Sequence, residues 1–217
     1  MKIEIKNYSK NIKRKIILDN INLTMESGNI YGLRGINGSG KTMLIRAICG
    51  LIYPTSGEIV IDGEVIGKEI SFPRSVGVMI ESPAFLPNYT AFDNLNQIAS
   101  LKKEIGDYEI NKILHDVGLN PNDKRTFRKF SLGMKQKLGI AAALMESPDI
   151  IILDEPFNAL DDISVEKVKG LILREKERGA LIILACHDIS ALRSLSDKII
   201  YIEEGRIIRT EDKEDLL

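Results

Sequence analysis

Short segments that alternate apolar and polar residues, or that are apolar throughout, dominate the first third of the chain. A period of two predicts β-strands that bury one face. An Asp-Gly pair at 62–63, the favoured turn of a tight β-hairpin, separates two of these segments. We therefore expect strands at residues 2–6, 21–25, 30–33, 58–61, 64–66 and 76–80.

Residues 91–145 follow a different pattern, because their apolar residues recur every three or four positions. That spacing predicts amphipathic helices. His115 lies in the second of them and is expected to face solvent. The expected apolar faces consist of Phe92, Leu95, Ile98 and Ala99, of Ile110, Ile113, Leu114 and Val117, and of Leu138, Ala141, Ala142 and Met145.

Two continuous apolar segments follow, at residues 150–153 and 181–185. Segments of this kind are typical of central parallel strands that are covered on both faces. A helix is expected between them around residues 165–172, and a last hairpin at 198–209.

The chain has 217 residues, which is enough for one sizeable core. Because strands stand at both ends and helices in the middle, the pattern predicts one α/β domain with a helical insertion. We expect the core, with a β subdomain, at residues 1–86 and 146–217, and the helical subdomain at residues 87–145.

Charge and composition exclude several classes of protein. The chain has 30 basic and 31 acidic residues, so it lacks the basic excess of a nucleic-acid-binding protein. The basic residues at 10–15 are interpreted as a solvated loop. No apolar run approaches the roughly 18 residues of a membrane helix, and the N-terminus alternates charged and apolar residues, unlike a signal peptide. Cys49 and Cys186 lie in apolar surroundings, which predicts free buried thiols in a cytoplasmic protein.

Residues 35–42 read Gly-Ile-Asn-Gly-Ser-Gly-Lys-Thr, a complete phosphate-binding loop between a predicted strand and a predicted helix. The loop backbone would point N–H groups at an anion, and the helix dipole would add attraction. Lys41 would reach the β- and γ-phosphates, and the Thr42 hydroxyl would bind Mg²⁺. A glycine-rich turn before an ordinary helix is the alternative. The predicted nucleotide-binding residues are Gly35, Ile36, Asn37, Gly38, Ser39, Gly40, Lys41, Thr42 and Met43.

Two adjacent carboxylates, Asp154 and Glu155, follow the apolar segment 150–153. Neighbouring residues of a strand point to opposite faces, so the two side chains are expected to differ in function. Asp154 would hold Mg²⁺, directly or through water, and Glu155 would act as the general base for an attacking water. The alternative is a strand that ends in solvated acids.

Further motifs carry a resemblance to a family, and it extends over nearly the whole chain. Residues 130–136, Phe-Ser-Leu-Gly-Met-Lys-Gln, resemble the Leu-Ser-Gly-Gly-Gln signature of the ATP-binding subunits of ABC transporters. Residues 158–161 match the D-loop of that family, and His187 stands where the family has its switch histidine. Residues 78–83 and 131–136 look most like bacterial exporters of the bacitracin-resistance and lantibiotic-immunity type.

The resemblance implies a P-loop NTPase with a RecA-like parallel core, an antiparallel β subdomain and a helical subdomain. It implies ATP hydrolysis with Mg²⁺, with Glu155 and His187 as catalytic residues. Ser131, placed to cap a helix, and Gly133 would contact the γ-phosphate of an ATP molecule held by the opposite subunit. Such a protein works as a head-to-tail homodimer, or paired with a similar ATPase, with two ATP molecules between the subunits.

The family likeness also implies separate integral-membrane permease subunits and a peripheral position on the inner face of the cell membrane. Residues 81–101 would form the docking surface for the permease. Phe85, Leu86 and Tyr89 would be exposed there. The alternative is that these three side chains pack inside the helical subdomain.

This chain departs from the family pattern at three places. Glu81 stands where the family usually has a glutamine that binds the metal or its water, and we include Glu81 among the metal ligands. In the signature, Leu132 and Met134 replace a glycine and the glutamine. The aromatic residue that stacks on adenine in the family would fall near Ile12, and Tyr8 is out of register.

The leading interpretation is an ATPase subunit that drives export of a peptide antibiotic or a related compound. The first alternative is a soluble ABC-type ATPase that is not linked to transport; the near-neutral charge provides no footprint for DNA or RNA. A small-molecule kinase or a GTPase is the second alternative. An arginine-rich lid and an Asn-Lys-x-Asp guanine motif are both missing from the sequence.

Overall fold

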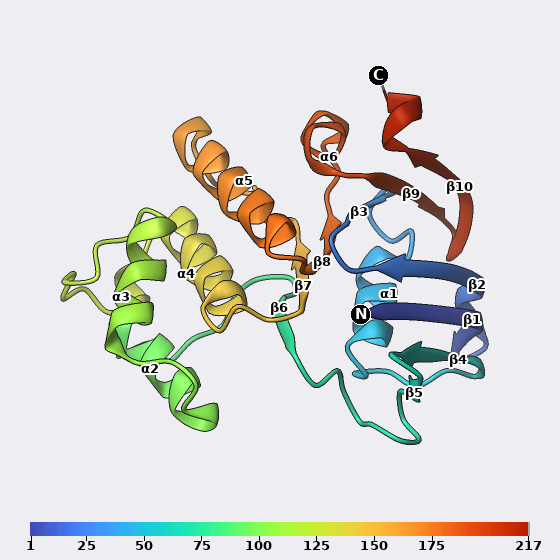
Figure 1. Cartoon of the computed structure of the whole chain (residues 1–217), viewed down its shortest axis with the longest axis horizontal. Helices are drawn as coiled ribbons and strands as arrows, with labels where there is room; N and C mark the ends of the chain where they lie inside the picture. Colours follow the sequence, from blue (N-terminus) through green and yellow to red (C-terminus); the bar gives the residue numbers. More distant parts are fainter. Residues whose placement is uncertain (217) are drawn as a thin grey trace.

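The computed structural model describes residues 1–216; Leu217, the last residue of the predicted core segment 146–217, lies outside the described residues. Two β-sheets, one mainly parallel and one antiparallel, form the right half of the molecule in Figure 1. The larger sheet has the order β10 (Arg206–Asp212), β9 (Lys198–Glu203), β3 (Ile30–Arg34), β8 (Leu181–Ala185), β7 (Ile150–Asp154) and β6 (Val76–Met79). All its strands are parallel except β10. The antiparallel sheet has the order β2 (Lys15–Glu26), β1 (Lys2–Ile12), β4 (Ser56–Ile61) and β5 (Glu64–Val65).

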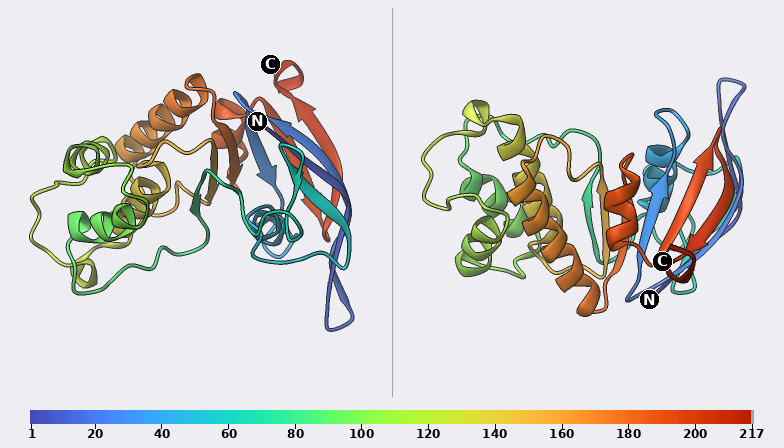
Figure 2. Two further views of the ribbon diagram at one scale, coloured as in Figure 1. Left: turned by 60° about the horizontal axis from the view of Figure 1, so that its bottom comes forward. Right: turned by 90° about the horizontal axis from the view of Figure 1, so that it is seen from above.

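Helices cover both faces of the parallel sheet (Figure 2). On one face, α1 (Lys41–Ile48) packs between the two sheets. On the other face lie α4 (Leu132–Leu144), α5 (Asp162–Glu177) and α6 (Ile189–Leu195). Beyond α4, at the far left of Figure 1, stand α2 (Ala91–Lys102) and α3 (Asp107–Asp116). Two 3₁₀ turns complete the chain, η1 (Phe127–Lys129) and η2 (Lys213–Leu216).

Strands β7 and β8 are buried along their whole length, and their side chains alternate between two cores. Ile150 and Ile152 pack toward α1 and the antiparallel sheet, whereas Ile151 and Leu153 pack toward the helices of the other face. Apolar burial on both faces explains why these two segments read as continuous apolar runs. By the same alternation, Asp154, the last residue of β7, faces the same side as Ile150 and Ile152.

The strands, the helices and the final hairpin expected from the sequence are present. His115 is exposed, and both cysteines are buried and free, as predicted. Residues 10–15 are exposed or partly exposed, as predicted, but they form a hairpin and not a loop. Strands β1 and β2 pair as far as Ile12 and Lys15, around a two-residue turn at Lys13 and Arg14 with φ of 46° and 68°. The reason is that pairing with β2 extends β1 beyond the alternating segment at residues 2–6.

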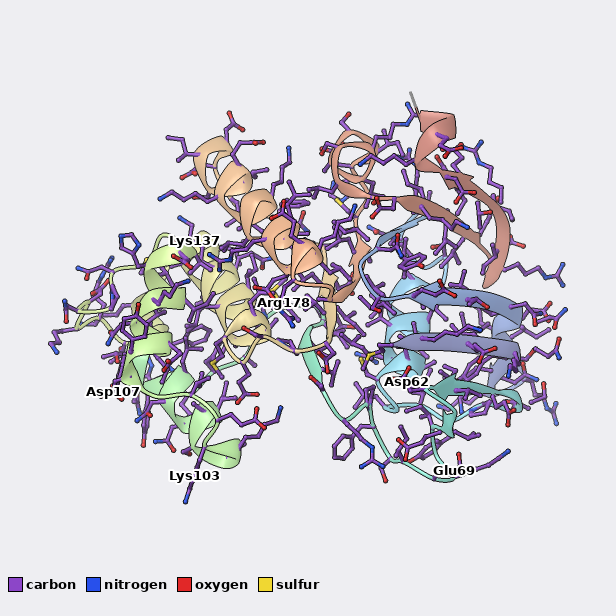
Figure 3. All side chains as sticks on the ribbon, in the orientation of Figure 1. Asp62, Glu69, Lys103, Asp107, Lys137 and Arg178 are labelled. Carbon is purple, nitrogen blue, oxygen red and sulfur yellow. The ribbon has the colours of Figure 1, made fainter. Side chains whose placement is uncertain are left out.

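Charged side chains lie on the outside of the molecule, for example Lys103 after the end of α2 and Glu69 in the connection between β5 and β6 (Figure 3). Among residues 1–216 the longest apolar helices are too short, or too polar, to cross a bilayer. The division into core and helical subdomain, with its boundaries at residues 86 and 146, stays a prediction.

Candidate functional site

The loop between β3 and α1 has the geometry of an anion site. Gly38 and Gly40 have φ of 83° and 113°, which favour glycine. A Cβ on Gly35 would lie 2.3 Å from the carbonyl oxygen of Ile202, so this position also needs glycine. Helix α1 begins at Lys41 without a side-chain cap, which leaves its first N–H groups available to a ligand.

Lys41 is buried and faces its own loop. Its ammonium group donates hydrogen bonds to the carbonyl oxygens of Gly35, at 2.6 Å, and Ile36, at 3.3 Å. Only 7% of the residue is exposed. The positive charge of Lys41 therefore lies inside the loop, close to where a phosphate would bind. A small change in the side-chain torsions would turn the ammonium group toward that phosphate.

Asp154 ends β7 on the α1 face, where it accepts a hydrogen bond of 2.8 Å from the Thr42 hydroxyl. Burial raises the pKa of Asp154, while the bond from Thr42 opposes this shift and the nearby Glu155 carboxylate adds to it. Buried negative charge beside a hydroxyl is a set of hard oxygen donors, which is what Mg²⁺ prefers. The residues present therefore fit the metal.

Glu155 follows Asp154 and leaves on the opposite face. Its carboxylate Oε2 lies 2.7 Å from Nδ1 of His187, which follows β8. The backbone N–H of Glu155 donates to the carbonyl oxygen of Ala185 at 2.8 Å, and its own carbonyl oxygen accepts from the Gln136 side chain at 2.8 Å. With a φ of 51°, Glu155 adopts a left-handed conformation that is uncommon outside glycine. These contacts hold that conformation and fix the carboxylate against the imidazole.

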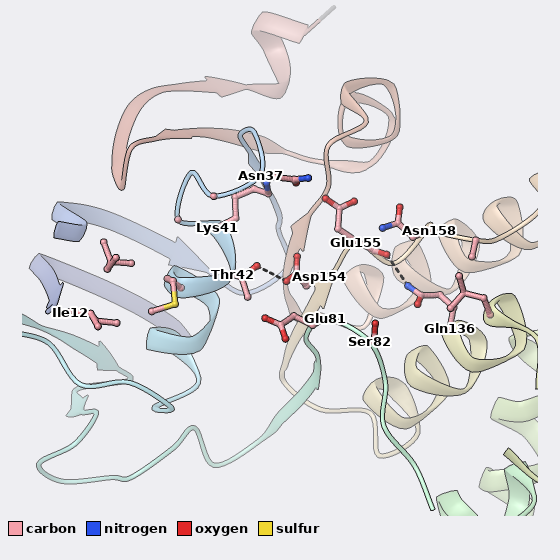
Figure 4. Close-up of a pocket in the computed structure, with 16 residues that line it drawn as sticks. Ile12, Asn37, Lys41, Thr42, Glu81, Ser82, Gln136, Asp154, Glu155 and Asn158 are labelled. Carbon is pink, nitrogen blue, oxygen red and sulfur yellow. Dashed lines mark hydrogen bonds between the residues drawn. The ribbon is translucent and has the colours of Figure 1, made fainter. Parts of the chain in front are cut away.

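A cavity of about 590 Å³ joins the phosphate-binding loop to the ends of β6 and β7 (Figure 4). Its volume lies within the usual range for small-molecule sites, about 300–1,000 Å³. It is lined by Ile12, Ile17, Asn37, Gly38, Gly40, Lys41, Thr42, Met43, Glu81, Ser82, Leu132, Gln136, Asp154, Glu155, Asn158 and Ala159.

Most of the site residues expected from the sequence line this cavity, and the others lie near it for identifiable reasons. Gly35 and the buried Ser39 form the packed base of the loop, while Ile36 is exposed on its outside. His187 reaches the cavity only through Glu155.

Ser131 and Gly133, the predicted second contact to phosphate, are not among the lining residues. Ser131 caps α4, because its hydroxyl accepts a hydrogen bond of 3.2 Å from the N–H of Met134. A Cβ on Gly133 would lie 2.7 Å from the carbonyl oxygen of Ala159, so the start of α4 packs closely on the 158–161 loop. Ser131 and Leu132 are exposed to solvent.

Glu81 lines the cavity, but its carboxylate is engaged elsewhere. It pairs with the guanidinium of Arg46, on α1, at 2.9 Å. Glu81 also has a positive φ, 57°, which turns the chain sharply after β6. Thr42 and Asp154 are therefore the two predicted metal ligands that the structure brings into contact, and Glu81 stands beside them.

The site residues predicted from the sequence do not include Gln136, Ile17, Ser82 or Asn158, although Gln136 and Asn158 belong to the signature and D-loop motifs. Gln136 is a polar residue at the start of the buried part of α4, and only 7% of its surface is exposed. Burial of such a group demands a hydrogen-bond partner. That partner, the Glu155 carbonyl, follows from the packing of α4 against β7 and not from any local pattern.

The wall of the cavity nearest the β1–β2 hairpin is aliphatic. Ile12 lies there, as expected from the sequence, together with Ile17 and Met43. Tyr8 is buried in the core between the sheets, where its hydroxyl donates to the carbonyl oxygen of Ile52 at 3.1 Å. No aromatic residue of the described chain lines this cavity.

The model of the ABC transporter family matches residues 18–158. The chain is 49% identical over 209 residues to the uncharacterized ABC transporter ATP-binding protein YybJ of Bacillus subtilis, covering 96% of each chain. It is 37% identical over 206 residues to the lantibiotic transport ATP-binding protein SrtF of Streptococcus pyogenes, covering 95% of this chain and 89% of SrtF. Bacitracin transport ATP-binding proteins of Enterococcus faecalis and Bacillus licheniformis match at 36% and 42% identity, over 68% and 63% of their own lengths.

The fold is similar to that of an ATP-binding cassette solved as a dimer in a post-hydrolysis state with ADP and Pi. The TM-score is 0.87 at 26% identity, over 97% of this chain and 98% of that chain. The predicted fold class is confirmed by this likeness, and the resemblance seen in the motifs is confirmed by the relatives.

Proposed function

The chain belongs to the ABC transporter family as an ATP-binding subunit with ATPase activity, and from that premise we propose that it powers export of a peptide antibiotic or a related compound through separate membrane subunits. The observation that carries the proposal is the end of β7. There Asp154 meets Thr42 on one face while Glu155 meets His187 on the other, at the edge of one cavity.

ATP would bind with its phosphates over the loop at residues 35–42. Lys41 would leave the Gly35 carbonyl for the β- and γ-phosphates, and the N–H groups at the start of α1 would contact the same oxygens. Thr42 and Asp154 would hold Mg²⁺, with Glu81 within reach of it. When bound, the metal neutralises charge that develops on the phosphate oxygens.

Glu155 would act as the general base. A water oxygen attacks the γ-phosphorus, the bond to the β–γ bridging oxygen breaks, and the water proton passes to the Glu155 carboxylate. His187 would position that carboxylate and the γ-phosphate through its contact with Glu155 at 2.7 Å. The Gln136 side chain would keep the Glu155 backbone in place.

We propose that a second subunit completes each site, because Ser131 and Gly133 are not among the residues that line the cavity of their own chain, although Leu132 between them is. The start of α4 is exposed, with 66% of Leu132 accessible, and its capped N-terminus is suited to meet an anion. A second copy of the chain, or a similar ATPase, would present Ser131 and Gly133 to the γ-phosphate in a head-to-tail dimer.

Contact with a permease is proposed for the docking loop, which we define as residues 84–90. Leu86 and Tyr89 are 47% and 41% exposed, whereas Phe85 packs against Phe127 at 5.4 Å between ring centroids. The prediction of exposed side chains therefore holds for Leu86 and Tyr89, and the alternative of packing inside the helical subdomain holds for Phe85. Exposed apolar side chains such as these would line a groove that receives a helix of a membrane protein.

Asn94 holds the docking loop on α2. Its buried side chain accepts a hydrogen bond from the N–H of Leu86 at 2.8 Å and donates to the carbonyl oxygens of Leu86, Tyr89 and Thr90. The loop is thus presented in one conformation, which lowers the entropic cost of docking. Such a subunit would lie at the inner face of the cell membrane, bound through its permease.

The cargo is proposed from the relatives, since SrtF and BcrA are described as lantibiotic and bacitracin transport proteins. A test would express the tagged chain with the membrane protein encoded beside it and measure both co-purification and resistance of the cells to lantibiotics. Leu86→Glu and Tyr89→Glu should lose both while the isolated chain keeps its ATPase activity. Tyr108→Glu, at a 75% exposed site on α3, is the matched control and should keep both.

If the unmodified chain co-purifies with no polytopic membrane protein, the transport proposal fails, and an ABC-type ATPase outside transport is the better description. If resistance is unchanged in a strain without the chain, the cargo assignment fails while the ATPase assignment stands.

A further inference from the structure

Three different metal-binding side chains meet at the ends of β7 and β8. The ligand atoms of Glu155, Cys186 and His187 all lie within 4.8 Å of one another. These residues supply a carboxylate oxygen, a thiol sulfur and an imidazole nitrogen. Mg²⁺ prefers oxygen ligands alone, whereas Zn²⁺ accepts all three kinds.

The sheet register explains why the three groups converge. In the parallel pair β7–β8, Asp154 lies opposite Ala185, so the next residues, Glu155 and Cys186, leave the sheet side by side. Cys186 points to the same face as Leu184, among the helices of that side. The chain then turns and brings His187 to 2.7 Å from Glu155. A cation between them would be held by residues that directly follow two adjacent buried strands, β7 and β8, which fix where the three side chains begin.

A second cavity, of about 330 Å³, leads to the thiol from outside. Cys186 and His187 line it together with Phe157, Asn158, Asp162 and Asp188, among others. It is separate from the nucleotide cavity, with Asn158 the one residue of the described chain that lines both. A cation could therefore reach the cluster without displacing a nucleotide. Asp162 and Asp188 make this path acidic, and Lys169, which also lines it, is paired with Glu166.

We propose that Glu155, Cys186 and His187 form a Zn²⁺ site, and that its occupation stops ATP hydrolysis. The inhibitory part rests on the proposed function, because Zn²⁺ would take up the carboxylate of the general base and the imidazole beside it. Zn²⁺ is held at about 2.0–2.3 Å from such ligands, so the donor atoms would come to roughly 3.5 Å from one another in a tetrahedral arrangement. The thiol would move inward and the Glu155–His187 pair would open slightly, with water as the fourth ligand.

The resting state of the thiol is compatible with catalysis. Burial raises the pKa of Cys186 to about 11, so the side chain is a neutral thiol at physiological pH. On binding, the thiol proton passes to solvent and the thiolate ligates the metal. Cys186 is 2% exposed and its sulfur accepts a hydrogen bond of 3.4 Å from the N–H of Asp188, but the thiol has no role in the reaction proposed above.

Binding can be measured on the full chain without nucleotide. Titration of Zn²⁺ against a chromophoric chelator should give a dissociation constant that Cys186→Ser, or Cys186→Ala if serine disturbs folding, weakens at least tenfold. Co²⁺ in place of Zn²⁺ should give thiolate-to-cobalt charge-transfer absorption in the parent that is lost in both variants. Cys49→Ser is the matched control, because Cys49 is also a buried thiol but lies among apolar residues of the other core.

Hydrolysis provides the second readout. Zn²⁺ should inhibit the parent and the Cys49→Ser variant, a chelator should restore both, and the Cys186 variants should keep their basal rate while tolerating at least tenfold more Zn²⁺. Equal binding by the parent and the Cys186 variants, or a Co²⁺ spectrum without thiolate absorption, overturns the site. Binding with the expected spectrum in a chain that hydrolyses no ATP would instead overturn the proposed function and leave the site standing.

Discussion

The guanidinium of Arg46 lies 2.9 Å from the carboxylate of Glu81, one helical turn beyond Thr42 on α1. The pair joins the helix of the phosphate-binding loop to the segment that follows β6. The Glu81 side chain is 61% exposed and the Arg46 side chain 38%, so water screens the pair and it is worth little, about 0–1 kcal/mol. Glu81 can therefore leave Arg46 at small cost when a cation arrives beside Asp154.

Removal of Arg46 should make Glu81 easier to recruit. We expect Arg46→Met to lower the Mg²⁺ concentration needed for half-maximal ATP binding, by no more than about fivefold, given the small energy of an exposed pair. Isothermal titration at several Mg²⁺ concentrations measures this. Arg74→Met removes a comparable exposed pair with Glu64, far from the cavity, and should change nothing. If Arg46→Met and Arg74→Met lower the Mg²⁺ concentration for half-maximal ATP binding equally, the effect does not come from release of Glu81.

Lys41→Ala should weaken ATP binding at least tenfold. The lysine makes charge-assisted hydrogen bonds, which are worth about 1.5–3 kcal/mol each, and no other cation lines the cavity among the described residues. Binding of a fluorescent ATP analogue measures the loss. Lys103→Ala, on the exposed end of α2, serves as the control. Unchanged affinity in Lys41→Ala would refute the assignment of the loop.

Glu155→Gln should bind ATP normally and lose turnover by about 10²–10⁴-fold, the usual contribution of a general base. Because bound ATP would persist, the variant should collect as a dimer on a size-exclusion column when ATP and Mg²⁺ are present. Glu177→Gln, on the exposed end of α5, should behave like the parent. Parental hydrolysis by Glu155→Gln would show that another group activates the water.

Asp154→Asn should stabilise the nucleotide-free chain at neutral pH. Burial raises the pKa of Asp154 above the ordinary value of about 3.9. The folded state therefore holds this proton more tightly than the unfolded state, and stability is lost as pH rises from about 4 through the raised pKa. Since the amide cannot ionise, the variant escapes that loss. Each kcal/mol corresponds to about 2–4 °C in a chain of this size.

Thermal unfolding between pH 4 and pH 8 tests this expectation. The melting temperature of the variant should exceed that of the parent at pH 7 and converge with it near pH 4. Adding ATP with Mg²⁺ should stabilise the parent more than the variant. A variant that melts below the parent at every pH would mean that the carboxylate is already compensated in the folded chain.

Ile12→Tyr should tighten ATP binding by supplying the missing stacking partner. Stacking of a base on an aromatic ring is worth about 1–3 kcal/mol, so the gain in affinity should be about fivefold to 150-fold. Titrations with ATP and with a triphosphate that lacks a base would separate stacking from phosphate binding. Ile16→Tyr, also exposed on the hairpin but outside the nucleotide cavity, is the control. Equal gains in both variants would contradict an adenine position at Ile12.

Local sequence patterns were sufficient to predict most of the fold and the phosphate-binding loop. Residues 35–42 form one turn whose geometry depends on glycines and on the adjacent strand and helix, all visible in sequence. The apolar segment before Asp154 and Glu155 likewise predicts that the two carboxylates have different neighbours. In the structure Asp154 contacts Thr42 and Glu155 contacts His187.

Contacts between distant elements could not be predicted in this way. The bond from Gln136 to the Glu155 carbonyl depends on how α4 packs on the sheet, and the Arg46–Glu81 pair depends on the positive φ after β6. The approach of Cys186 to Glu155 depends on strand register. Such features arise from tertiary packing, for which a single sequence has no periodic signal.

Three packed phenylalanine rings connect the docking loop to the start of α4. Phe127 packs on Phe85 and, at 5.9 Å between centroids, on Phe130, and its N–H donates to the Tyr89 carbonyl. Close-packed rings transmit displacement because they compress very little. A push on Leu86 would therefore tilt the residue that precedes Ser131. In the proposed dimer, arrival of cargo at the permease would therefore be mechanically coupled to the position of Ser131 relative to the neighbouring subunit's nucleotide.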